Sequence, residues 1–154
     1  MSSRWLNSEE LATWRSVSLM QLQLNARLNQ GLADHGVSLQ DYLVMASLSD
    51  RPDGRCRIVE LARELGWEKS RLSHHLSRMC DRRLVEKAPC PLDQRGVFAV
   101  LTETGRELLV RVAPTHVRDV RHYFIDLTTA EDRRHLRRVA DAVLEQLARE
   151  QSDT

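Results

Sequence analysis

The segment IVELARELGWEKSRLSHHLSRMCDRRLVEK, residues 58–87, constrains the fold more than any other part of the chain. Apolar residues recur in it at helical spacing on both sides of Gly66. Those before the glycine are Val59, Leu61, Ala62 and Leu65, and those after it are Leu72, Leu76 and Met79. Two short helices joined by about four residues around a glycine are typical of a helix-turn-helix. We therefore predict this motif, with both apolar sets facing the core.

The stretch that follows predicts a β-hairpin. Residues 85–87 and 97–101 alternate with their neighbours in the period of two that strands show. Between them lies KAPCPLDQRGVF, residues 87–98, which holds two prolines, a cysteine, an acid and an arginine. Alone, such a segment could be a catalytic loop, a metal or redox site, or a loop that grips a partner. Its place between two strands favours a hairpin tip, in which Pro89 and Pro91 stiffen the turn.

Two further helices are expected before this motif. Ser8 followed by two acids is typical of a helix N-terminus, and apolar residues then recur at helical spacing as far as Leu32. Gly36 ends this helix. Ser38, with Asp41 three places later, is a second capping signal and begins a shorter helix.

Two more helices are expected after the hairpin. Thr102 can cap a helix that runs toward Ile125, and Pro114 should kink or interrupt it. Thr128 with Glu131 is read as the capping box of a last helix. The apolar face of that helix comprises Leu136, Val139, Ala140, Val143, Leu144 and Leu147. The first and last helices could pack on the central motif of one chain or form a shared core with a second chain, and their length favours the second arrangement.

The bulk composition limits the possible functions. The chain has 154 residues, enough for one folding unit with a core, and a net charge of +1. Nucleic-acid binding would therefore need a local basic patch. Of the 23 basic residues, two are lysines, Lys69 and Lys87, and the others are arginines. Arginine suits bidentate contacts with phosphate and guanine, although codon bias also explains its frequency.

Cellular location is predicted from what the sequence lacks. It shows no signal-peptide core and no run near the ~20 apolar residues of a membrane span. Cys56, Cys80 and Cys90 form no C-x-x-C pair. We expect a cytoplasmic protein with reduced thiols that makes no membrane contact.

The second helix of the motif carries a polar stripe opposite its apolar face. The stripe comprises Lys69, Ser70, Arg71, Ser73, His74, Ser77 and Arg78. Between Lys69 and Arg83, five cations accompany one acid, Asp81. Such a helix fits the DNA major groove, where hydroxyls bond phosphates and an arginine can bind O6 and N7 of guanine. A merely solvated face is the alternative.

The stretch from Ile58 to Gly105 resembles the winged helix-turn-helix of the MarR family of bacterial transcription regulators. The most specific part is LVEKAPCPLDQRGVFAVLTETG, which is similar to that family's strand, Asp-x-Arg tip, returning strand and Leu-Thr-x-x-Gly exit. Asp93 and Arg95 occupy the Asp-x-Arg positions. The flanking helices resemble the family's dimerisation arms.

This resemblance implies a mainly α fold with a small β-hairpin wing. It implies an N-terminal dimerisation arm (1–35), a DNA-binding domain (36–104) and C-terminal dimerisation helices (105–154). The function implied is a homodimeric, sequence-specific regulator of a pseudo-palindromic operator, a repressor released by a small aromatic or anionic ligand. Arg95 would enter the minor groove, and Asp93 could orient its guanidinium through a bidentate pair.

The chain departs from the family pattern at two positions. Arg83 stands where a glycine is usual, so the helix is expected to end without a glycine in the left-handed conformation. His75 stands where an apolar residue is common, at the edge of the core stripe. Neither change removes an expected DNA contact.

The same residues also allow other functions. A regulator of this fold could instead sense oxidation through Cys90, expected at the exposed wing tip, or through Cys80. A winged-helix module that binds only protein would need an apolar or acidic stripe. We expect no enzyme, since no nucleophile motif, phosphate loop or paired carboxylates appear. No cofactor is expected, and no metal, because His74 and His75 diverge by about 100° on a helix.

Overall fold

The computed structural model describes residues 4–152, so residues 1–3 and 153–154 of the two predicted dimerisation segments lie outside it. Its elements are α1 (Ser8–Ala33), α2 (Leu39–Ser49), β1 (Arg55–Arg57), α3 (Ile58–Leu65), α4 (Lys69–Asp81), β2 (Val85–Cys90), β3 (Asp93–Leu101), α5 (Glu103–Tyr123), the 3-10 helix η1 (Ile125–Leu127) and α6 (Ala130–Ser152). They form two compact units that divide within α5, between Val117 and Arg118. The predicted mainly α fold is confirmed. None of the described helices combines the length and apolarity of a membrane span.

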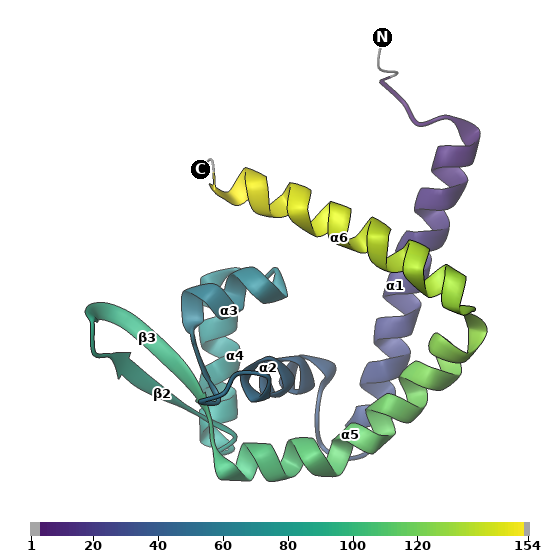
Figure 1. Ribbon diagram of the computed structural model, residues 1–154. Helices are drawn as coiled ribbons and strands as arrows, with labels where there is room; N and C mark the ends of the chain where they lie inside the picture. The colour runs from purple at the N-terminus through teal and green to yellow at the C-terminus, as the bar shows by residue number, and fades with distance from the viewer. Residues whose placement is uncertain (1–3, 153–154) are drawn as a thin grey trace. The chain divides into compact units, whose positions relative to one another are not determined.

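Helices α3 and α4 form the predicted helix-turn-helix (Figure 1). Gly66 ends α3 in the left-handed conformation, with φ of 67°. The inner face of α4 is as predicted, because Leu72, Leu76 and Met79 are buried. The inner face of α3 differs by one position, since its first residue, Ile58, is buried while Val59 is 48% exposed. Residues 58, 61 and 62 share one face at helical spacing, and residue 59 lies about 100° away from residue 58.

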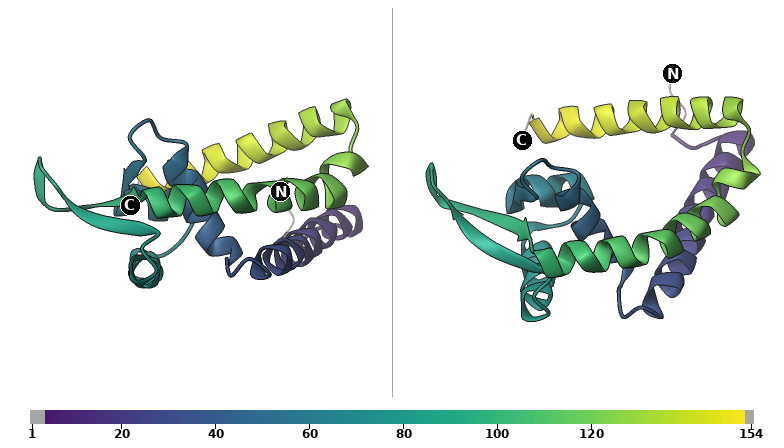
Figure 2. Two further views of the ribbon diagram at one scale, coloured as in Figure 1. Left: turned by 90° about the horizontal axis from the view of Figure 1, so that it is seen from below. Right: turned by 60° about the horizontal axis from the view of Figure 1, so that its bottom comes forward.

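Strands β2 and β3 form the predicted hairpin, which extends away from α3 and α4 (Figures 1 and 2). Its two-residue tip is Pro91-Leu92. The sheet has a third strand that the sequence showed only as a short connecting stretch. Strand β1 pairs antiparallel with β3, with Cys56 opposite Ala99, so that β3 lies in the middle. This pairing fixes the base of the hairpin against the first residues of α3.

Helix α4 ends in a left-handed residue although it has no glycine there. Arg83 has φ of 59° and is the one non-glycine with positive φ in the described part of the chain. Its amide donates to the carbonyl of Cys80, and the amide of Leu84 donates to that of Met79. These bonds form a Schellman motif with a buried Leu84. The helix therefore ends without a left-handed glycine, as expected, and Arg83 adopts that conformation in its place.

The Leu-Thr-x-x-Gly exit joins α5 to the end of α4. Thr102 caps α5 as predicted, since its Oγ1 accepts from the amide of Gly105 at 3.0 Å. The same hydroxyl donates to the carbonyl of Arg83 at 2.7 Å. A Cβ on Gly105 would lie 2.2 Å from the carbonyl oxygen of Leu84, so a larger residue does not fit. This close approach explains the residue types of the exit segment.

The helix N-termini show which capping signals were correct. The Ser38–Asp41 capping box of α2 is confirmed. The cap of α1 is Asn7, not Ser8, because Asn7 and Glu10 exchange the two bonds of a capping box at 2.9 and 2.8 Å. The general signal was right, but Asn7 is an equally good cap one residue earlier.

The C-terminal helices decide between some of the expectations. Of the two expected effects of Pro114, a kink or an interruption, the interruption does not occur, because α5 is one helix from Glu103 to Tyr123. The cap of α6 is Thr129 with Asp132, one residue later than predicted, since Thr129 Oγ1 accepts from the Asp132 amide at 3.1 Å. Within the second unit, the apolar face of α6 is exposed, with Leu144 63% accessible.

Candidate nucleic-acid interface

The predicted polar stripe of α4 lies on the side of the helix opposite its buried face. Lys69, Ser70, Arg71, His74, Ser77 and Arg78 are exposed, and Ser73 is half-buried. Their accessibility follows from the sequence, because Leu72, Leu76 and Met79 turn the opposite side into the core. The sequence-predicted residues of this helix therefore form one continuous surface.

Lys87 links the hairpin to this surface and was not among the predicted site residues. Its ammonium donates to Ser77 Oγ at 3.0 Å and lies 3.4 Å from the carbonyl oxygen of Ser73. Ser77 Oγ also donates to the carbonyl of Ser73 at 3.0 Å. The sequence held a signal for Lys87, since residues 85 and 87 lie on the same face of a strand, and the apolar Val85 marks that face as the one turned toward the helices.

A groove of about 480 Å³ opens between the hairpin, α3 and the start of α4. Its charged lining comprises Arg57, Glu60, Arg63, Lys69, Lys87, Asp93 and Arg95. Five of these side chains are cations and two are acids. Sequence reasoning missed Arg57 and Arg63, because β1 and the exposed side of α3 reach the groove only through the pairing of β1 with β3. The groove is the local basic patch that a nearly neutral chain needs to bind a polyanion.

Asp93 and Arg95 lie together at the hairpin tip, but not in the predicted way. Asp93 Oδ1 accepts a hydrogen bond from the backbone amide of Arg95 at 3.0 Å. No ion pair joins their side chains among the residues that the structure describes. The carboxylate of Asp93 thus binds the backbone amide of Arg95 at the start of β3, in place of the expected bidentate pair with the guanidinium. Asp93 therefore restrains the backbone here, and Arg95 is exposed.

Cys90 is buried, which corrects the expectation of an exposed thiol. Only 6% of its surface is accessible, and the guanidinium of Arg57 donates to its sulfur at 3.3 Å. Its Cβ would lie 2.9 Å from a Cβ on Gly96, so the returning strand covers it closely. Leu92 at the tip is instead 93% exposed. Cys80 is half-buried, and burial raises the pKa of the Cys56 thiol.

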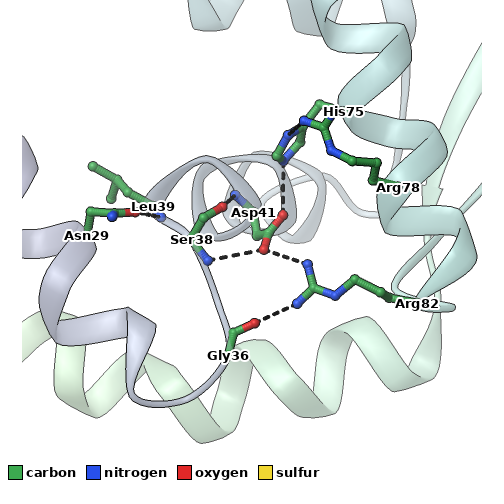
Figure 3. A network of polar contacts seen from close by, with 8 residues as sticks. All are labelled: Asn29, Gly36, Ser38, Leu39, Asp41, His75, Arg78 and Arg82. Carbon is green, nitrogen blue, oxygen red and sulfur yellow. Dashed lines mark hydrogen bonds and ion pairs between the residues drawn. The ribbon is translucent and has the colours of Figure 1, made fainter.

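A buried carboxylate joins α2 to α4 (Figure 3). Asp41 Oδ2 accepts from Arg82 Nη1 at 2.7 Å, and Asp41 Oδ1 lies 3.0 Å from His75 Nε2. Burial acts to raise the pKa of Asp41, but hydrogen bonds from His75, Arg82 and the Ser38 amide outweigh it and hold that pKa well below its usual range. His75 is therefore a polar residue at the edge of the core that meets a charged partner.

The aromatic residue of the turn holds a second arginine. The guanidinium carbon of Arg71 lies 4.7 Å from the centre of the Trp67 ring, which is a cation–π contact. Trp67 also packs edge-on against the His75 ring, with centroids 5.5 Å apart. No group of three or more His, Cys, Asp or Glu side chains within residues 4–152 is placed to hold a metal ion.

Comparisons with known proteins agree with this geometry. A model of the MarR family matches residues 35–96. The structure is similar to AbsC, a MarR family transcriptional regulator from Streptomyces coelicolor, with 38% identity, 95% of this chain and 99% of that chain covered, and a TM-score of 0.88. Sco3205, a MarR family transcriptional regulator from the same organism solved in complex with DNA, shows 35% identity, coverage of 94% and 91%, and a TM-score of 0.87. No curated protein matches the chain.

Proposed function

The chain belongs to the MarR family of transcriptional regulators, and from that membership we propose that it binds DNA in a sequence-specific manner as a homodimer. The observation that carries the proposal is the basic groove, which continues the polar stripe of α4 onto the hairpin. Solved relatives with DNA, such as Sco3205, support it. An acidic or apolar surface at this place would have favoured a protein partner.

Each part of the interface has a proposed role. Helix α4, hereafter the recognition helix, enters the major groove, where Arg71 and Arg78 bind base edges. The remaining residues of its stripe, Lys69, Ser70, Ser73, His74 and Ser77, contact phosphates. The hairpin serves as the wing, whose Arg95 lies in the flanking minor groove while Asp93 fixes the turn.

The missed cations extend this interface. Lys87 is anchored on Ser77, so its charge lies where β2 meets the recognition helix. Arg57 and Arg63 line the same groove. A phosphate backbone that passes between the wing and the helix would meet these three side chains, each of which adds to the electrostatic part of the affinity.

The dimer is proposed to form from residues 1–35 and 105–154, which leaves residues 36–104 as the DNA-binding domain. Trp14 of α1 and Leu144 of α6 are each more than 60% exposed in a single chain. Apolar helix faces of this kind are covered by a partner in stable proteins. Two recognition helices related by a twofold axis would then contact half-sites about one helical turn apart.

We further propose that the protein represses its target and is released by a small aromatic or anionic ligand. This part rests on the family resemblance. The structure favours ligand release over thiol sensing, because Cys90 is buried and Cys56 has a raised pKa, whereas a sensing thiol must be accessible and ionised. Deletion of the gene should raise transcription from a promoter that the protein binds, and lowered transcription would identify an activator.

The proposal is tested by fluorescence anisotropy with fragments of DNA from upstream of the gene. Phosphate contacts release counterions, so the affinity should fall by about a thousand-fold or more between about 50 and 200 mM salt if six or more phosphates are contacted. Binding that does not depend on salt, or no binding at low salt, would contradict the proposed DNA binding.

A further inference from the structure

The imidazole of His75 bridges a buried carboxylate and an arginine of the recognition helix. Its Nε2 lies 3.0 Å from Asp41 Oδ1, and its Nδ1 lies 3.1 Å from Arg78 Nη2 (Figure 3). The His75 side chain is 12% exposed, and that of Asp41 is 6% exposed. A buried anion is thus connected through one ring to a side chain at the protein surface.

The two contacts determine where the ring proton lies. An arginine guanidinium has only N–H donors, so Nδ1 of His75 must accept and carries no proton. The proton of the neutral ring is then on Nε2, the nitrogen that lies 3.0 Å from Asp41 Oδ1. A second proton would occupy Nδ1 and place two donors and two positive charges against each other at Arg78. The contact to Asp41 would remain, and the contact to Arg78 would be lost.

We propose that His75 is a positioning residue that holds Arg78 in its base-reading conformation, so that selectivity for the target sequence requires neutral His75. The inference rests on the proposed DNA-binding function. A free arginine side chain loses rotamer entropy when it binds a base, and a prior contact reduces that loss. The charge of Arg78 does not depend on the contact, so His75 affects base selectivity and leaves phosphate attraction unchanged.

The surroundings of His75 add to this arrangement. The charged groups that line its pocket are Asp41 from α2 and Arg71, Arg78 and Arg82 from the recognition helix and its C-cap. Trp67 packs against the ring edge-on and carries Arg71 on its face, so both proposed base-reading arginines are held by one cluster.

The test compares two DNA duplexes with the full-length protein. One duplex is enriched by the wild type from a randomised library, and the other is a scrambled version of it. His75→Leu should lower the ratio of the two affinities about ten-fold by weakening only the enriched duplex. His75→Gln, whose amide has both a donor and an acceptor, should retain most of the ratio. His75→Leu should cause no further loss in an Arg78→Ala background.

The two His75 variants separate positioning from a structural role. A structural role would weaken both duplexes equally in His75→Leu, whereas positioning weakens only the enriched duplex. An equal loss on both duplexes, or an unchanged ratio, in His75→Leu would overturn the inference, as would a loss of the ratio in His75→Gln as large as that in His75→Leu.

A measurement without DNA keeps this inference distinct from the proposed function. The ¹⁵N chemical shifts of the His75 ring at about pH 8 should identify Nε2 as protonated and Nδ1 as the bare acceptor. The reverse tautomer would overturn the positioning role even if DNA binding is observed. If the tautomer is as expected and no duplex is enriched, the proposed function fails and the base-reading role of Arg78 fails with it.

Discussion

The guanidinium of Arg82 lies 2.7 Å from the buried carboxylate of Asp41 and donates through its second nitrogen to the carbonyl of Gly36. This contact joins the end of the recognition helix to the first turn of α2. Asp41 also completes the capping box with Ser38. One side chain thus caps one helix and fixes the position of another.

Asp41→Asn should reduce stability and change its pH dependence. Removal of the charge leaves Arg82 without its partner, which we expect to destabilise the fold by about 1–3 kcal/mol at pH 7. Because the folded pKa of Asp41 is lowered, its contribution is present above the unfolded value of about 3.9 and is lost as the pH falls below it. Between pH 7 and pH 3, the free energy of unfolding measured in urea should fall by about 1 kcal/mol more in the wild type than in Asp41→Asn. An equal fall in both proteins would mean that Asp41 does not contribute to acid destabilisation. Asp53→Ala, at an exposed ion pair, is the matched control.

Arg83→Gly should stabilise the protein. A left-handed conformation costs a non-glycine residue about 1–2 kcal/mol, and the extra freedom of glycine in the unfolded chain offsets part of the gain. We expect a net gain of up to about 1 kcal/mol by chemical unfolding. Gly66→Ala, at the equivalent place of α3, should lose about 1 kcal/mol, since its φ is also positive and nothing lies within 4 Å of the added Cβ. A lower free energy of unfolding in Arg83→Gly would mean that the arginine side chain stabilises the turn.

Gly105→Ala should be the most destabilising of the alanine substitutions at Gly36, Gly54, Gly66, Gly96 and Gly105. The new Cβ would lie 2.2 Å from the Leu84 carbonyl oxygen, which is backbone and cannot rotate away. We expect a loss of about 2–3 kcal/mol or more, seen as a lower thermal midpoint. Gly36→Ala is the control, because its surroundings are open and only its positive φ is unfavourable. A similar loss at both positions would contradict the packing at the α5 exit.

Leu144→Glu should weaken the homodimer. The residue is 63% exposed in the single chain, within an apolar face that we propose a second chain covers. A carboxylate in that interface would lose its hydration, so the dissociation constant should rise. Sedimentation velocity over a concentration series measures this, with Arg138→Glu on the polar side of α6 as the control. A wild type that is monomeric at micromolar concentration would overturn the dimer.

The sequence predicted the features that depend on near neighbours. The apolar spacing of α4 correctly placed six of its seven polar stripe residues on the surface, with Ser73 half-buried, and the Ser38–Asp41 signal located the start of α2. Capping signals one residue apart were confused at Ser8 and Thr128, because adjacent Asn, Ser and Thr residues cap almost equally well.

Features that join distant residues could not be predicted. Arg82 and Asp41 are 41 residues apart, and nothing in the local pattern of either indicates the other. The burial of Cys90 depends on the register that places Gly96 against it. Arg57 and Arg63 reach the basic groove only because β1 pairs with β3. Long-range pairing therefore determined the parts of the site that sequence analysis missed.

Binding of DNA between the wing and the recognition helix is tested by the salt dependence of affinity in variants of the groove. The slope of log affinity against log salt should decrease by about one per chain in Lys87→Ala and in Arg95→Ala, because each removes one phosphate or minor-groove cation. Arg138→Ala, on the polar side of α6, should leave the slope unchanged. Unchanged slopes in both groove variants, with binding intact, would contradict the proposal that DNA lies between the wing and the recognition helix.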